Sequence, residues 1–246
     1  MLNPEKFKVR IPEKKEVEKE GAKGKVPDEV MEGKEGEKEK KEIRLIEKSP
    51  LDYQDKKDLL LAYFEEKPAS WLGVDARFYK KEGEKKKAEI LRELAERKEK
   101  VQELLEKLGF IYEKKDFEEE EQKTYDIGCH FLVSKNSENL FRLKKALEEK
   151  SDKEIGLSLG YPETAIEGFL NKEMLDYEKL RESLSNKELK ELQKEGVFKF
   201  LTFHPSKDHW REELEVIRRY QKLIREKSPK IYKEIIQQAA DPLTTK

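Results

Sequence analysis

The sequence lacks the features that mark secreted and membrane-spanning proteins. It contains one cysteine, Cys129, so no disulfide can form within the chain, which favours a reducing compartment. Residues 1–20 hold no apolar run of the kind found in secretory signals. No segment approaches the roughly 20 apolar residues that cross a bilayer. These absences predict a soluble, cytoplasmic protein that does not insert into a membrane.

An excess of charge of one sign is also missing. The chain has 54 Lys and Arg against 55 Asp and Glu, which gives a formal net charge of -1. Proteins that bind nucleic acid usually carry a strong positive charge on the binding domain. A protein partner, or self-association, is therefore favoured over nucleic acid. Because 44% of the residues are charged and only 35% are hydrophobic, we expect helices with broad solvated faces.

Sequence signatures of catalysis are missing as well. The chain has no glycine-rich phosphate loop, no Gly-x-Ser-x-Gly, no His-Glu-x-x-His and no Cys-x-x-Cys. With so many carboxylates, pairs of acids arise in any helix and do not identify an active site. The sequence therefore favours a non-enzymatic interaction or accessory module without a cofactor. The alternative is an enzyme, or a protein that binds a small ligand or metal, centred on His130, His204, His209 and the corner at Tyr161–Glu163. RNA binding through the arginine-rich C-terminal helix is the third possibility.

The composition changes along the chain and predicts its organisation. Residues 1–42 are rich in Lys and Glu and poor in large apolar side chains, which predicts a disordered arm. This arm is either a solvated tail or a segment that docks on a partner. Residues 43–109 are predicted to be helical, apart from a loop at 67–79, and to pack with an α+β core at 110–240. Residues 241–246 are expected to form a tail.

Three segments are predicted to be strands: "GFIYEKKD", "TYDIGCHFLVS" and "VFKFLTFH", the last at 197–204. In the second, Cys129 and Phe131 share the face expected to point into the core, and His130 lies on the other face. Helices are predicted between and after the strands, with Ser137, Asp152, Ser185 and Ser228 as caps. Pro229 is expected as the first residue of the last helix, and Gly109 as the residue after the helix that ends near Leu108. The predicted fold class is α+β and mostly α, with a small three-stranded antiparallel sheet packed with helices.

One stretch, "LGYPETAIEGF" at 159–169, carries a family resemblance. It resembles an uncharacterised domain family of archaea and candidate-phylum bacteria, through Leu159, Gly160, Tyr161, Pro162, Ala165, Ile166 and Phe169. The likeness covers at most residues 105–235. Many relatives carry two cysteines where this chain has Thr164 and Ala165, so the departure removes any thiol chemistry. The resemblance implies a fold unit and no activity.

The same stretch can be a helix corner or a small site. Gly160 suits the end of one helix, and Pro162 suits the first turn of the next. As a site, Tyr161, Glu163 and Thr164 would be polar groups at a helix N-terminus, where anions bind. The carboxylate of Glu163 already lies at that positive end, so the structural interpretation is favoured.

The chain has only three histidines, His130, His204 and His209. If the second and third predicted strands paired, the three imidazoles would converge and could bind Zn²⁺, although their spacing is not a known ligand signature. His204 could instead be a general base oriented by Asp208, but no nucleophile has a defined relation to it. Neither a metal site nor a catalytic role is favoured.

The segment "HWREELEVIRRYQKLIREK" is predicted to be an amphipathic helix whose apolar stripe begins at Trp210. The stripe is expected to pack in the core. The alternative is a surface helix that docks a protein or RNA, with Trp210 and Arg211 in the contact. The interleaved glutamates dilute the charge of the arginines and favour a protein over RNA.

Overall fold

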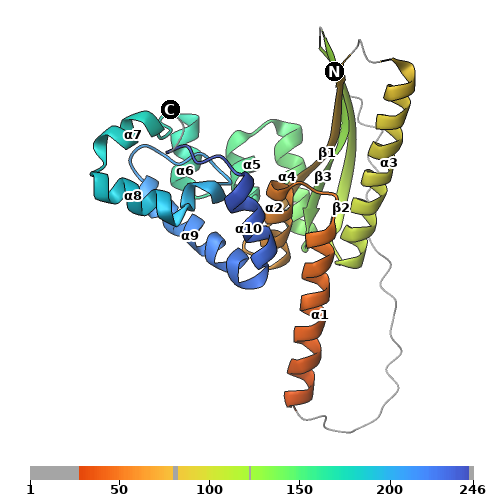
Figure 1. The fold of residues 1–246 in the computed structure, drawn as a ribbon, viewed down its shortest axis with the longest axis horizontal. Coiled ribbons are helices and arrows are strands. Elements are labelled where there is room, and N and C mark those ends of the chain that lie inside the picture. The colour runs from red at the N-terminus through yellow and green to blue at the C-terminus, as the bar shows by residue number, and fades with distance from the viewer. Residues whose placement is uncertain (1–27, 80–82, 122, 244–246) are drawn as a thin grey trace.

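The computed structural model describes residues 28–79, 83–121 and 123–243, with side chains from residue 36 onward. A three-stranded sheet stands beside a larger group of helices (Figure 1). In chain order the elements are α1 (Asp28–Lys48), α2 (Tyr53–Tyr63), β1 (Ser70–Tyr79), α3 (Glu84–Lys107), β2 (Ile111–Glu120), β3 (Thr124–Ser134), α4 (Ser137–Glu149), α5 (Asp152–Ser158), α6 (Glu163–Leu170), α7 (Tyr177–Ser183), α8 (Asn186–Glu195), the 3₁₀ turn η2 (Val197–Phe200), α9 (Trp210–Lys227) and α10 (Pro229–Gln238).

The sheet is antiparallel with the order β1-β3-β2, so β3 is central and β2 is an edge strand. This confirms the predicted α+β, mostly α fold class, but one predicted strand is wrong. Residues 197–204 form η2 and a loop, and the third strand is β1, inside the stretch predicted as a loop and within the segment predicted as helical. An apolar run such as Val197–Phe200 suits a buried turn as well as a buried strand.

The N-terminal boundary also differs from the prediction. Residues 28–42, predicted to belong to the disordered arm, form the first part of α1, while residues 1–27 lie outside the described structure. Ile43 and Ile46 are buried, and Glu42 accepts a hydrogen bond from the Tyr63 hydroxyl of α2. Further along the chain, Lys227 at the end of α9 pairs with Glu39 at 2.8 Å. The C-terminal half of α1 therefore packs onto the domain.

The predicted C-terminal tail is also part of the fold as far as the structure describes it. Leu243 is buried, and its carbonyl accepts a hydrogen bond of 3.1 Å from the Gln193 side chain of α8. Its own N–H donates to Asp241 at 2.9 Å. Residues 244–246 lie outside the described structure.

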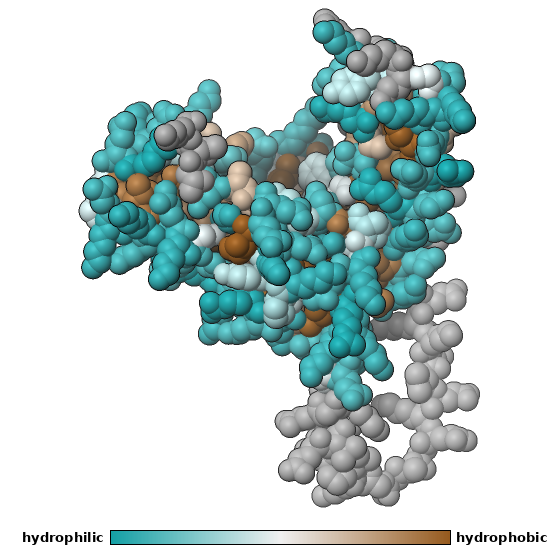
Figure 2. Space-filling view, viewed as in Figure 1, coloured by the Kyte–Doolittle hydropathy of each residue, from teal (hydrophilic) through white to brown (hydrophobic). Residues whose placement is uncertain are grey.

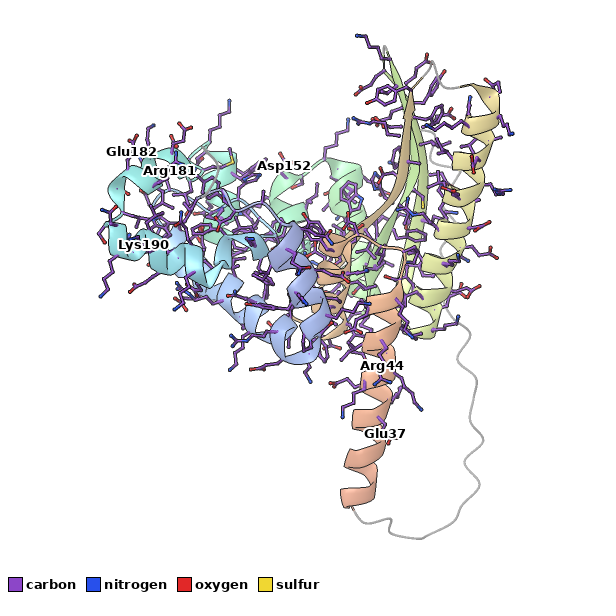
Figure 3. All side chains as sticks on the ribbon, viewed as in Figure 1. Glu37, Arg44, Asp152, Arg181, Glu182 and Lys190 are labelled. Carbon is purple, nitrogen blue, oxygen red and sulfur yellow. The ribbon has the colours of Figure 1, made fainter. Side chains whose placement is uncertain are left out.

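The two faces of the sheet are covered unequally. One face carries Leu72, Val74, Cys129 and Phe131 into a large apolar cluster that also contains Leu94 and Val101 of α3. On the opposite face the described residues cover one end, where Leu132 packs against Leu140 and Leu143 of α4. They leave the other end of this face open. Charged side chains such as Glu37, Arg44 and Lys190 project outward from the helices (Figure 3).

Candidate functional site

The open half of the sheet is the main candidate site. It is a hollow of about 430 Å³ lined from all three strands by Trp71, Asp75, Arg77, Lys115, Phe117, Glu119, Asp126 and His130. The strand register places all eight on one face, because Gly73 lies opposite His130, and His130 lies opposite Lys115. Figure 2 shows the molecule hollowed between the helices at left and the sheet at right. We call this surface the open face.

Three rings cross the open face in a row, one from each strand. The ring centroids of Trp71 and His130 lie 5.1 Å apart at 84°, an edge-to-face contact. His130 stacks on Phe117 at 4.6 Å and 17°. Trp71 remains 40% exposed, although large aromatic side chains usually lose most of their surface to the core. The row is therefore apolar surface that the described part of the chain does not cover.

His130, in the middle of the row, belongs to an apolar surface rather than to a charged one. Burial lowers the pKa of its imidazole, so the ring is neutral near pH 7. Its Nδ1 atom is buried and has no hydrogen-bond partner among the described residues. Gly73 and Gly128 flank the ring on the same face and leave room for it.

The charges around the row are mostly acidic. Arg77 and Asp126 neutralise each other through two hydrogen bonds of 2.5 and 2.8 Å. The outer part of β2 carries Glu119 on the open face and Asp116, Glu118 and Glu120 on the opposite face, and Glu121 follows the strand. All five side chains are exposed. A ligand that crosses the open face toward β2 would meet a negative field, which favours a basic ligand.

Asp55 of α2 lies beside β1, the edge strand away from β2. Its carboxylate accepts a hydrogen bond of 2.9 Å from the Gly73 N–H. Burial, helped by the nearby charge of Asp52, raises the pKa of this carboxyl to about 7. The folded state therefore binds a proton that the unfolded state releases near pH 4. The resulting stabilisation is complete below pH 4 and is lost as the pH rises to about 7.

We therefore expect Asp55→Asn to become progressively more stable than the native protein between pH 4 and pH 7.5. Asparagine keeps an acceptor for Gly73 and never ionises. Because Asp55 is only partly buried, we expect a difference of roughly 1 to 2 kcal/mol at pH 7.5. Urea unfolding followed by circular dichroism at several pH values measures it, with Glu182→Gln on the exposed surface of α7 as control. A difference that stays constant with pH would contradict this explanation.

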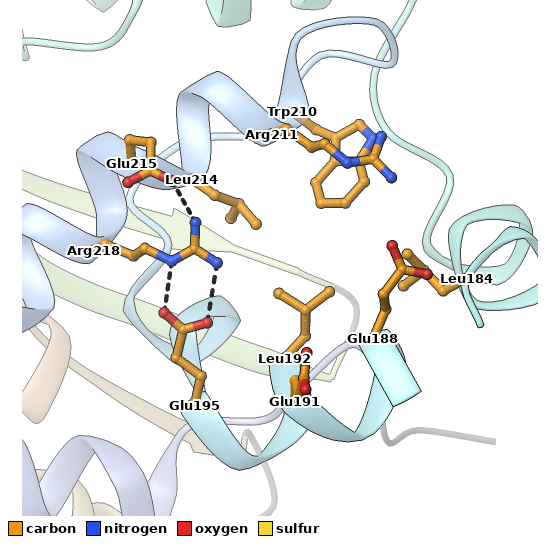
Figure 4. A pocket seen from close by; sticks show the side chains of 10 residues that line it. All are labelled: Leu184, Glu188, Glu191, Leu192, Glu195, Trp210, Arg211, Leu214, Glu215 and Arg218. Carbon is orange, nitrogen blue, oxygen red and sulfur yellow. Dashed lines mark hydrogen bonds and ion pairs between the residues drawn. The ribbon is translucent and has the colours of Figure 1, made fainter. Parts of the chain in front are cut away.

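A second hollow, of about 330 Å³, lies between α8 and α9 and contains two predicted contact residues (Figure 4). Trp210 is buried, and the guanidinium of Arg211 lies 4.3 Å from the centroid of its ring. Arg218 donates to both oxygens of Glu195, at 2.6 and 3.1 Å. Glu188 accepts the Ser185 N–H in a capping box. These groups fix α8 against α9, so this hollow is a helix interface.

The apolar stripe of α9 packs in the core, since Leu214, Ile217, Tyr220 and Ile224 are all buried with Trp210. Its arginines do not gather on one free surface. Arg218 pairs with Glu195, and Arg219 pairs with Glu66 at 2.8 Å. A helix that docks RNA would keep such side chains available to phosphates.

The stretch at 159–169 is a tightly packed corner. Gly160 has φ +76°, and a Cβ there would lie 2.7 Å from the Pro68 ring. The Tyr161 ring packs at 5.6 Å from that of Phe203, and burial raises the pKa of its hydroxyl above the usual range. Glu163 points to solvent and Thr164 is half-buried. The structure therefore does not bring these three polar groups together as one site.

The structure does not bring the three histidines together: His130 lies in β3, whereas His204 and His209 lie before α9. Both edges of β3 are occupied, by β1 and β2, so the segment that ends at His204 does not pair beside His130. His204, Asp208 and His209 are exposed before α9, where Nδ1 of His209 lies 3.1 Å from Glu212. Within the described residues, no three His, Cys, Asp or Glu side chains gather as metal ligands.

The lone cysteine lies on the covered face of the sheet. Cys129 is buried there, and burial raises the pKa of its thiol to about 11. A thiol in such surroundings is a small apolar side chain rather than a nucleophile.

The sequence does not predict the open face, because β1 lies in the segment predicted to be a loop. A signal for the strand is present: in "SWLGVDARFY" the residues Leu72, Val74 and Phe78 alternate with Trp71, Asp75 and Arg77, as in a half-buried strand.

Comparison of the chain with family models, curated proteins and solved structures found no match. Among the described helices, none combines the length and the apolar character needed to cross a membrane.

Proposed function

We propose that the protein is a non-enzymatic interaction module that binds an extended, basic polypeptide segment of a protein partner at the open face. The observation that carries the proposal is the row formed by Trp71, His130 and Phe117, on the half of the sheet that the described residues leave uncovered. Exposed aromatic side chains that form one surface are typical of the centres of protein interfaces.

The acidic edge defines the chemistry of the partner. Beyond Phe117, every residue of β2 that a bound segment would meet is a glutamate, from Glu118 to Glu120. A segment with lysine or arginine beside apolar residues would satisfy both the rings and the carboxylates. Since β2 is an edge strand, its backbone can also pair with such a segment by strand addition.

The cytosol remains the proposed compartment. Its support is the single, buried thiol of Cys129, which offers no disulfide within the chain. We likewise retain a protein partner in preference to nucleic acid, because the carboxylates around the open face would repel phosphates.

A labelled peptide that alternates lysine with Phe, Val and Ile tests the proposal by fluorescence anisotropy. We expect binding that weakens with salt, and a loss of about 30-fold or more in Trp71→Ala, as for a central aromatic contact. The matched control is Phe169→Ala, since Phe169 on α6 is 46% exposed and lies outside the open face. Both variants should keep the native circular dichroism spectrum and melting temperature.

Three outcomes would overturn the proposal. These are equal binding of an acidic peptide of the same pattern, an affinity that Trp71→Ala leaves unchanged, and a preference for a single-stranded RNA of similar length over the basic peptide. The last would assign the rings to base stacking instead.

A further inference from the structure

The N-terminal segment of the chain has the chemistry of the proposed ligand. Residues 6–11, "KFKVRI", alternate strictly between cations, at Lys6, Lys8 and Arg10, and apolar side chains, at Phe7, Val9 and Ile11. A period of two places the cations on one face of an extended segment and the apolar side chains on the other.

The outer half of β2 has the complementary pattern. Asp116, Glu118 and Glu120 share one face of the strand, while Phe117 lies on the open face between Lys115 and Glu119. Asp116 already accepts a hydrogen bond of 2.9 Å from Lys98 of α3, so this face of β2 already binds one lysine of the domain. The edge of β2 that faces away from β3 has no strand beside it among the described residues.

We propose that residues 6–11 pair with this edge of β2 in the same molecule, as a fourth strand. The spacing then places three cations beside three carboxylates, and either strand direction preserves the match. The apolar side chains extend the aromatic row past Phe117. Pairs of opposite charge directly across neighbouring strands stabilise a sheet.

The connection is long enough for this pairing. Residues 12–27 lie between the segment and the start of α1, and an extended chain of that length spans about 55 Å. The helix α1 is about 31 Å long at 1.5 Å per residue. After running back along α1, whose C-terminal half is packed on the domain through Ile43 and Ile46, the chain has about 24 Å of extended length left to span toward β2.

This inference rests on the proposed function, because the segment would be an internal competitor for the same surface. A tethered strand competes at a high effective concentration, so it weakens the binding of an external peptide without changing the site itself. A partner would have to displace it.

Hydrogen exchange of the full chain, followed by mass spectrometry over residues 115–121, tests the pairing. We expect Lys6→Glu, Lys8→Glu and Arg10→Glu together to speed exchange of these amides at least fivefold. The matched control is Lys14→Glu, Lys15→Glu and Lys19→Glu, which makes the same change in net charge outside the segment. Adding Asp116→Lys and Glu118→Lys to the first variant should restore slow exchange.

Exchange that is unchanged in the first variant, or equally faster in the control, would overturn the inference. Protection that grows with protein concentration would overturn it too, since the strand would then come from a second copy. The proposed function is tested separately by the labelled peptide, which should bind at least threefold more tightly to the first variant. Peptide binding without any change in exchange would leave only the proposed function standing, whereas the reverse result would leave only this inference.

Discussion

Replacing Glu213 by alanine is expected to lower the free energy of unfolding by about 3 kcal/mol. Glu213 of α9 is only 2% exposed, and its two oxygens accept the N–H and the hydroxyl of Ser206, each at 2.7 Å. Hydrogen bonds to a charged group stabilise by roughly 1.5 to 3 kcal/mol, and removing the acceptor leaves the buried donors of Ser206 without a partner. Alanine also leaves a cavity where the longer side chain was.

The loss should be large because Ser206 is a junction between elements. It forms an isolated β-bridge with Met174, and its Cβ lies against Gly168 of α6. The neighbouring Lys207 N–H donates to the Glu173 carbonyl at 2.8 Å. Through these contacts the carboxylate of Glu213 fixes the end of α6 to the start of α9.

Urea unfolding of Glu213→Ala and of Glu212→Ala separates this role from that of an ordinary surface glutamate. The side chain of Glu212 is 79% exposed, and its contact with His209 should contribute no more than about 0.5 kcal/mol. Glu213→Gln should fall between the two, because an amide can accept at one position only. Equal stabilities of the two alanine variants would contradict the assigned role of Glu213.

Local signals in the sequence predicted the helices well. Ser185 and Ser228 cap α8 and α10 as predicted, and Pro229 follows Ser228 at the start of its helix. Gly109 follows α3 with φ +70°, the conformation expected of the glycine after a helix. At α4 and α5 the predicted caps are one residue late, since Asn136 and Ser151 accept the hydrogen bonds. Caps are predictable because both partners lie within three residues of each other.

The third strand and the open face depend on interactions that local signals do not contain. The alternation in β1 includes Gly73 and Asp75, which are uncommon in strands, so local preferences predict a loop there. The pairing of Gly73 with His130 joins residues far apart in the sequence. The face of β3 was predicted correctly, because Cys129 and Phe131 are buried and His130 is not. What could not be predicted is that Trp71 and Phe117 would flank His130.

Gly128→Ala is expected to lower the free energy of unfolding by about 3 kcal/mol and to disturb the open face. Gly128 lies on the central strand β3, and a Cβ there would be 2.7 Å from the Val74 carbonyl oxygen and 2.8 Å from Cα of Asp75. These are backbone atoms of β1, which cannot move aside as the end of a side chain can. Overpacking of this kind usually costs 1 to 3 kcal/mol, and the central position of β3 places this site at the upper end.

The matched control is Gly36→Ala, because a Cβ at Gly36 in α1 meets nothing within 4 Å. Alanine in an open helical position should stabilise by roughly 0.5 to 1 kcal/mol, so the two substitutions should have opposite signs in the same thermal or urea unfolding measurement. The strand shift in Gly128→Ala should also move Trp71 relative to His130 and weaken the basic peptide, even where the variant is fully folded. A Gly128→Ala protein with native stability and native affinity would contradict the close pairing of β1 and β3, and with it the position of Trp71 in the row.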